Sequence, residues 1–245
     1  MATFERLIRE MPIPADWDKK PFVLPGTYGP RNFLHALVYA KTRSNFLAAG
    51  SSRAVFELNY EGRNTILKIA TSIAGVAQNK EDIKIIFGTR TKNNPIVIPG
   101  IDYDEESPAP LWIHQEFAEV VHDSEFELEN GFSPWSLVLY VKEIMGIGTP
   151  KVSPEIATAN YPKVSGSKLA HDLLDLLRNM GLSETNEKSF LDDIGGLSNW
   201  GEYQGRYVVI DFGYSHEVAQ TYYSGNRVTG AYGTGWPPTR GNRRW

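Results

Sequence analysis

The chain has 245 residues, of which 41% are hydrophobic, and this is enough for one large domain or two small lobes with a real core. The sequence contains no cysteine, which excludes disulfide frameworks, thiolate zinc sites and cysteine nucleophiles. The formal net charge of -4 excludes a generally basic protein that coats nucleic acid.

The first residues do not form a secretory signal, because Glu5 and Glu10 interrupt the apolar stretch that such a signal needs. No apolar run approaches the roughly 20 residues of a membrane span. We therefore expect a soluble, cytoplasmic protein with no membrane partner.

The first half of the chain has the pattern of strands. After an opening rich in Pro and Gly, Phe33–Ala49 is expected to form a helix and its exit. Ala54–Leu58 and Thr65–Ala70 alternate apolar and polar residues with Gly62 in the stretch between them, which predicts a β-hairpin. Val76–Phe87 has apolar residues near helical spacing and predicts a short helix.

Two more strands are expected at Pro95–Tyr103 and Leu111–Val121, so that the first half forms a small sheet with one helix packed on it. From about residue 122 the pattern becomes helical. Pro134–Gly146 begins with proline and ends at glycine, and the apolar residues of Ser167–Met180 lie on one helix face. A buried strand is expected at 205–213.

This order of elements predicts the α+β class, with a β-rich lobe over 1–121 and a helical lobe over 122–223. Residues 224–245 form a tail with four arginines and no acidic residue. The tail is either an arm that contacts nucleic acid or a larger protein assembly, or a solvated end.

The strand at 205–213 ends in a candidate metal ligand. Asp211 closes the apolar run and is followed by Phe212 and Gly213. A carboxylate at the end of a buried strand, beside a turn freed by glycine, suits a hard cation such as Mg²⁺. A capping or turn aspartate is the alternative interpretation.

An acidic, glycine-rich loop is expected shortly before that strand. Asp193 and Asn199 lie in this stretch, and they would supply a proton acceptor and a second oxygen ligand for a metal. The alternative is a solvated turn.

Lys68 interrupts an apolar strand, where burial of an unpaired ammonium is costly. It therefore needs an anionic partner, which is Glu81 or Asp82 on the following helix, or a bound phosphate. The alternative is a lysine that extends to water.

A loop of small residues, with Gly50, Ser51 and Ser52, precedes Val55 and the first strand of the hairpin. Such a loop brings backbone N–H groups near phosphate oxygens, although an ordinary entry to a hairpin explains it equally well.

The order of these features is the serial layout of a protein kinase. Over about residues 45–215 the chain resembles the protein-kinase-like superfamily, and more narrowly the compact kinase-like proteins of tailed bacteriophages. The segments that carry the resemblance are GSSRAVF, LKIA, GVAQN, WIHQEFAE, NWG and GRYVVIDFG. The resemblance implies a two-lobed protein-kinase-like fold, with a small antiparallel sheet and one helix in the first lobe and a reduced, mainly helical second lobe.

The resemblance also implies how ATP would bind in the cleft between the lobes. Lys68 would hold the α- and β-phosphates and would pair with Glu81 or Asp82. The backbone from Glu116 to Ala118 would form the hinge that hydrogen-bonds adenine. The small-residue loop and the first strand would cover the nucleotide.

The catalytic residues follow from the same resemblance. Asp193 would be the catalytic base, Asn199 a metal ligand and Asp211 the main Mg²⁺ ligand. The chain departs from the family pattern here, because five residues, not four, separate Asp193 from Asn199. The small-residue loop departs as well, because Arg53 takes the place of one of its glycines.

Three functions are compatible with these features. The first is a phosphotransferase that uses ATP and Mg²⁺ and acts on a protein acceptor. The second is a pseudokinase that binds a partner without turnover, and the third is a phage virion or assembly component anchored by the tail. The expected partners are a nucleotide and a protein substrate or a phage or host protein, with nucleic acid contacted only through the tail.

Overall fold

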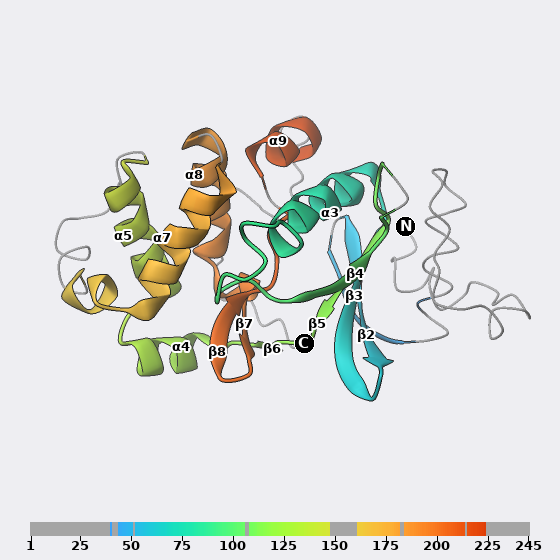
Figure 1. Cartoon of the computed structure of the whole chain (residues 1–245), viewed down its shortest axis with the longest axis horizontal. Helices are drawn as coiled ribbons and strands as arrows, with labels where there is room; N and C mark the ends of the chain where they lie inside the picture. Colours follow the sequence, from blue (N-terminus) through green and yellow to red (C-terminus); the bar gives the residue numbers. More distant parts are fainter. Residues whose placement is uncertain are drawn as a thin grey trace, which may run out of the picture.

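The computed structural model describes the chain over residues 40, 44–50, 52–105, 108–147, 161–181, 184–213 and 215–223 (Figure 1). The tail at 224–245, most of the expected opening helix, and Ser51 lie outside the described residues. A five-stranded sheet covered by one helix lies beside a second group of elements that is mainly helical. The predicted α+β class is confirmed.

The first sheet is antiparallel and has the strand order β1-β2-β3-β5-β4. Its hairpin between β2 and β3 turns at Glu61 and Gly62, which both have positive φ, as a tight two-residue turn requires. The strands are β1 (Asn45–Ala49), β2 (Arg53–Tyr60), β3 (Arg63–Ala70), β4 (Gly100–Tyr103) and β5 (Trp112–Glu116).

Helix α3 (Ile73–Ile86) follows β3 and approaches the start of β2 closely. Ser72 caps the helix, because its side-chain oxygen accepts from the N–H of Gly75 at 3.3 Å. A Cβ at Gly75 would lie 2.1 Å from the carbonyl oxygen of Ser52. Glycine at this position therefore lets the helix lie against the start of β2.

A second antiparallel sheet contains β6 (Glu119–Val120), β7 (Trp200–Tyr203) and β8 (Arg206–Val209). Strands β7 and β8 form a hairpin that turns at residues 204–205, both with positive φ. Residues 117–118 connect the two sheets, since β5 ends immediately before them and β6 begins immediately after.

The remaining elements are helical, and most of them lie on the side of the second sheet that faces away from the five-stranded sheet (Figure 1). In α7 the predicted apolar face is confirmed, with Ser167 as its N-cap and Gly181, at φ 59°, following its last turn. The elements are α4 (Asp123–Asn130), α5 (Pro134–Met145), α7 (Lys168–Met180), α8 (Glu184–Ile194), η2 (Leu197–Asn199), α9 (His216–Val218) and η3 (Ala219–Tyr223).

Several predicted elements are corrected. Asn45–Ala49, expected as a helix exit, is strand β1, because it pairs with β2. The expected strand Leu111–Val121 is divided between the two sheets by the connection at 117–118, and the expected strand at 205–213 is paired over Arg206–Val209 only. The loop expected around Asp193 is instead the last turn of α8.

Two separate hydrophobic cores hold these elements together. One lies on the five-stranded sheet and includes Phe56 and Leu67, and the other lies among the helices and the second sheet and includes Leu173 and Trp200. None of the helices in the described part of the chain combines the length and the apolarity needed to cross a membrane.

Candidate functional site

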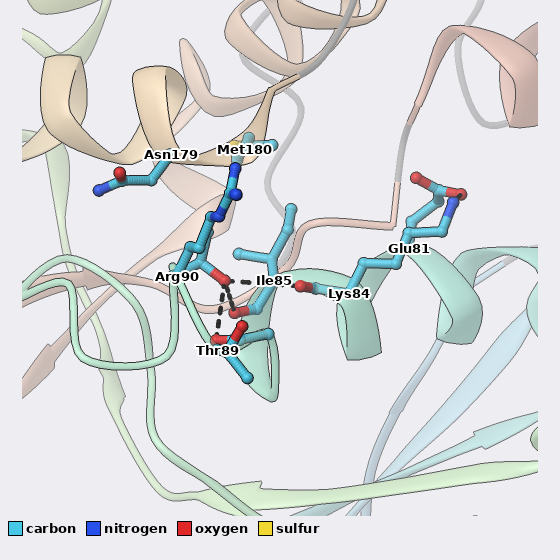
Figure 2. Close-up of a pocket in the computed structure, with 9 residues that line it drawn as sticks. Glu81, Lys84, Ile85, Thr89, Arg90, Asn179 and Met180 are labelled. Atoms are coloured by element: carbon cyan, nitrogen blue, oxygen red, sulfur yellow. Dashed lines mark hydrogen bonds and ion pairs between the residues drawn. The ribbon is translucent and has the colours of Figure 1, made fainter.

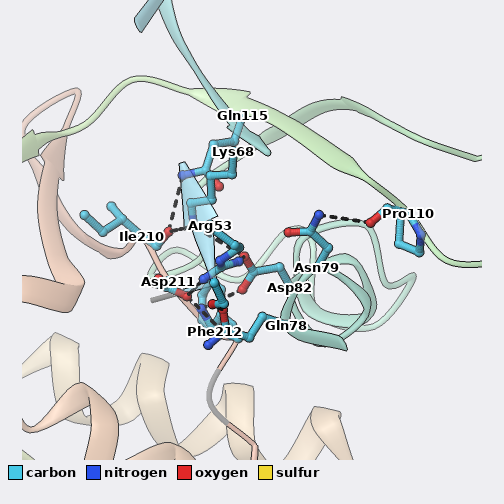
Figure 3. A network of polar contacts seen from close by, with 12 residues as sticks. Arg53, Lys68, Gln78, Asn79, Asp82, Pro110, Gln115, Ile210, Asp211 and Phe212 are labelled. Carbon is cyan, nitrogen blue, oxygen red and sulfur yellow. Dashed lines mark hydrogen bonds and ion pairs between the residues drawn. The ribbon is translucent and has the colours of Figure 1, made fainter. Parts of the chain in front are cut away.

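Lys68 lies in the middle of β3 with its ammonium facing other charged groups. Val55 on β2 and Ile113 on β5 are its direct cross-strand neighbours, so all three side chains project from one face of the sheet. Lys68 is buried, and its Nζ donates to the carbonyl oxygen of Ile210 at 2.6 Å and to Oδ2 of Asp82 at 3.3 Å (Figure 3). The strand alternation therefore brings the buried amine to the segment that follows β8.

Asp82, on α3, is the carboxylate that pairs with Lys68. It is fully buried and also accepts from Nη1 of Arg53 at 2.6 Å and from the N–H of Phe212 at 2.7 Å. Its neighbour Glu81 lies on the outer side of α3 and pairs with Lys84 at 2.6 Å. Of the two acids that the sequence left open, only Asp82 contacts Lys68.

Asp211 follows β8 and carries a partner that sequence reasoning did not assign to it. Its Oδ1 accepts from Nη2 of Arg53 at 2.5 Å and from the N–H of Gly213 at 3.0 Å. Figure 3 shows Arg53, Lys68, Asp82 and Asp211 directed toward one another, and we call these four residues the charged cluster.

The electrostatics of the charged cluster keep Arg53 and Asp211 ionised. Burial lowers the pKa of Arg53, but the charges of Asp211 and Asp82 raise it above its usual range. Burial raises the pKa of Asp211, while Arg53 and then Lys68 lower it, and the result lies below the usual range of a carboxyl.

Sequence alternation contained a signal for Arg53. Arg53 stands two residues before Val55 on β2, so the two side chains project from the same face of the strand. Val55 is the cross-strand neighbour of Lys68, so this is also the face from which Lys68 projects. A charged residue in phase with this face needs a buried partner, and two carboxylates provide it.

Asp193 and Asn199 lie beside the segment that leads into the cluster. Nδ2 of Asn199 donates to the carbonyl oxygen of Asp193 at 2.9 Å, and the carbonyl oxygen of Asn199 accepts from the N–H of Ile210 at 2.9 Å. Burial, and then the negative charge of Asp211, raise the pKa of Asp193 to about 8. Asp193 is therefore largely protonated at neutral pH.

The expected phosphate loop is engaged in contacts of its own. The N–H of Gly50 donates to the carbonyl oxygen of Arg53 at 2.9 Å, and the hydroxyl of Ser52 donates to the side chain of Gln78. Ser51 lies outside the described residues, so its N–H is not placed. Val55 is half-buried on the face that it shares with Lys68.

The expected hinge is the connection between the two sheets. Glu116 is the last residue of β5, and its carboxylate pairs with Arg63 at 2.6 Å. Ala118 is buried and precedes β6. The backbone from Glu116 to Ala118 thus lies where the chain passes from one sheet to the other.

The expected Mg²⁺ ligands Asp211 and Asn199 each already use one side-chain atom for a contact within the chain. Oδ1 of Asp211 already accepts from a guanidinium and a backbone N–H, and the amide of Asn199 directs its nitrogen to Asp193. Among the residues that the structure describes, no group of three or more His, Cys, Asp or Glu side chains is arranged to hold a metal ion.

A cavity of about 230 Å³ lies on the other side of α3, between its second half, the turn after it and the end of α7 (Figure 2). Glu81, Lys84, Arg90 and Met180 are among the residues that line it. Glu81 therefore belongs to this cavity and not to the charged cluster.

No protein-family model matches the chain, and no curated protein matches it by sequence. Among solved structures, the chain is similar to the aminoglycoside phosphotransferase APH(4)-Ia, with 13% identity and a TM-score of 0.37 over 76% of this chain and 72% of that one. It is also similar to a thermostable mutant of that enzyme in its apo form, with 14% identity and a TM-score of 0.34 over 70% and 67% of the two chains.

A third structure, of a thermostable mutant in a ternary complex with ADP and hygromycin B, has 17% identity and a TM-score of 0.34 over 71% of this chain and 67% of that one.

Proposed function

We propose that the protein binds ATP at the charged cluster, with the adenine at the connection between the sheets and the phosphates toward Lys68. The observation that carries this proposal is the meeting of Lys68 from β3, Asp82 from α3 and Asp211 after β8. In protein kinases a strand lysine paired with a helix acid holds the α- and β-phosphates, and an aspartate after a later strand lies beside them.

Nucleotide binding is tested by thermal unfolding of the full chain with ATP, ADP and GTP, each with Mg²⁺ and with EDTA. A ligand at 100 times its Kd stabilises the fold by about 2.7 kcal/mol, which corresponds to a melting shift of roughly 5–10 °C in a chain of this size. The shift should disappear in Lys68→Met and persist in Lys84→Met, whose ammonium is mostly exposed. A wild-type protein that no nucleotide stabilises would contradict the proposal.

Phosphoryl transfer to a hydroxyl acceptor is the catalytic extension of this proposal, and Asp193 is its base. Asp193 lies beside Asn199 and near Asp211, whose charge acts on it. Because the pKa of Asp193 is raised to about 8, its carboxylate accepts a proton only as the pH rises through this value. Transfer of label from ATP to added protein should therefore increase about tenfold per pH unit below 8, and it should vanish in Asp193→Asn.

A pseudokinase that binds a partner without turnover is the second candidate. The contact between Arg53 and Asp211 favours it, since that carboxylate is already neutralised. Nucleotide stabilisation without any Asp193-dependent transfer between pH 6 and 9 would select this candidate over the first.

A further inference from the structure

Arg53 pairs with Asp211, the aspartate that a kinase-like site would leave free to bind a metal ion. Its guanidinium bridges Asp82 and Asp211 with N–O distances of 2.6 and 2.5 Å, and its side chain is 7% exposed. The two carboxylates come from α3 and from the segment after β8, so the arginine joins both sides of the charged cluster.

The formal charges of the cluster balance without a metal. Arg53 and Lys68 contribute two positive charges, and Asp82 and Asp211 contribute two negative charges. In a protein kinase the strand lysine and helix acid neutralise each other, and the remaining aspartate needs Mg²⁺. The additional cation removes that need here.

One of the two carboxylate oxygens of Asp211 is occupied by donors. Oδ1 of Asp211 accepts from Arg53 and from the N–H of Gly213, so its two lone pairs are both used. Mg²⁺ requires oxygen ligands at about 2.0–2.1 Å in octahedral geometry, so a metal ion at Asp211 would have to use Oδ2. It would then share the carboxylate with the guanidinium of Arg53, and the two cations would repel each other at short range.

The surrounding backbone makes room for the guanidinium. A Cβ at Gly213 would lie 2.9 Å from Nη2 of Arg53 and 2.8 Å from Cβ of Gln78. Only a residue without a side chain permits this close approach, and the same residue donates its N–H to Asp211. The arginine thus lies in a space that the chain keeps open for it.

We propose that Arg53 takes the place of a divalent cation beside Asp211, so that a nucleotide binds to this protein without a metal ion. The inference rests on the proposed nucleotide binding. Mg²⁺ would increase the affinity for the nucleotide by bridging the aspartate and the phosphates. A carboxylate that Arg53 already neutralises gains little from such a bridge. Arg53 is therefore the residue that determines the metal requirement of the site.

The experiment measures the Kd of ATP for the full chain by calorimetry, with excess Mg²⁺ and with EDTA. In the wild-type protein the two Kd values should agree within about threefold, which is less than the tenfold difference that corresponds to about 1.4 kcal/mol. In Arg53→Gln, Asp211 is released, and ATP should bind at least about tenfold more tightly with Mg²⁺ than with EDTA. Arg53→Lys keeps the positive charge and should remain independent of metal.

The matched control is Arg178→Gln, which removes an exposed arginine from the surface pair with Asp175 and should behave as the wild type does. Wild-type binding that requires Mg²⁺ would overturn the inference and leave the proposed function standing. An Arg53→Gln protein that folds and still ignores Mg²⁺ would overturn it as well. Absence of ATP binding in both conditions would overturn the proposed function, and the inference with it. If Arg53→Gln does not fold, the wild-type comparison and Arg53→Lys decide.

Discussion

Replacement of Asp82 by asparagine should cost more stability than any other single loss of charge in α3. Asp82 is fully buried, and it neutralises Arg53 and Lys68, whose side chains are 7% and 6% exposed. Asparagine keeps the shape and can still accept from the N–H of Phe212, but its amide NH2 replaces the oxygen that accepts from Arg53 and Lys68, so the change removes both the charge and that acceptor. Two buried cations would then share Asp211 as their remaining carboxylate in the cluster.

Removal of one partner from a buried ion pair destabilises a protein by about 3–5 kcal/mol, because the other charge is left uncompensated. For a chain of this size that corresponds to a fall in Tm of roughly 6–20 °C. The free energy of unfolding is measured by urea denaturation followed by circular dichroism, with the slope checked for a change in the unfolding transition.

Glu81→Gln is the matched control, because it removes the neighbouring carboxylate on the same helix. Glu81 pairs with Lys84, whose side chain is 63% exposed, and a surface pair of this kind contributes at most about 1 kcal/mol. Equal losses in the two variants, or a loss below about 1 kcal/mol in Asp82→Asn, would refute the view that the cluster stabilises the fold through charge.

Two further results are expected. Burial lowers the pKa of His114 to about 4, so between pH 6.5 and 4 the unfolded chain takes up a proton that the folded chain does not bind. The free energy of unfolding should therefore fall by about 3 kcal/mol over this range. In urea titrations, His114→Gln should flatten this decline. Gly213→Ala should displace Arg53 and Gln78 and lower the Tm clearly, whereas Gly50→Ala, where a Cβ would meet its nearest atom at 3.8 Å, should leave the Tm within a few degrees; similar Tm values for these two alanine variants would contradict the close approach.

Local patterns in the sequence were sufficient for the elements with strong signals at both ends. Helix α7 has its apolar face, Ser167 before it and Gly181 after it, and the structure places it where these signals do. Helix α8 was missed because Asp192 and Asp193, just before two glycines, have the composition of a turn. The strong propensity of glycine for turns outweighed a helix that is held by packing against its neighbours.

The hairpin of β7 and β8 was missed for a related reason. Its turn is made by Gln204 and Gly205, and glutamine is not among the residues that usually mark a two-residue turn. As a result the single strand expected there was placed without its antiparallel partner.

The charged cluster was predicted in part. Strand alternation and family order were enough to select Lys68 and Asp211, but not the ion pair between Arg53 and Asp211. That pair joins residues 158 positions apart, and no local pattern records such a contact. The sequence did not decide whether Glu81 or Asp82 pairs with Lys68, because only the rotation of α3 against the sheet determines which of the two faces inward.

Helix α3 belongs to both hydrophobic cores, since Val76 packs with the five-stranded sheet while Ile85 and Ile86 pack with the helices. The same helix carries Asp82 between these two anchoring points. The amide protons of α3 should thus exchange only when the whole molecule unfolds. Native-state hydrogen exchange should therefore show that the two hydrophobic cores unfold as one cooperative unit. A ligand that engages Asp82 or its partners acts on this shared element and slows exchange on both sides of it.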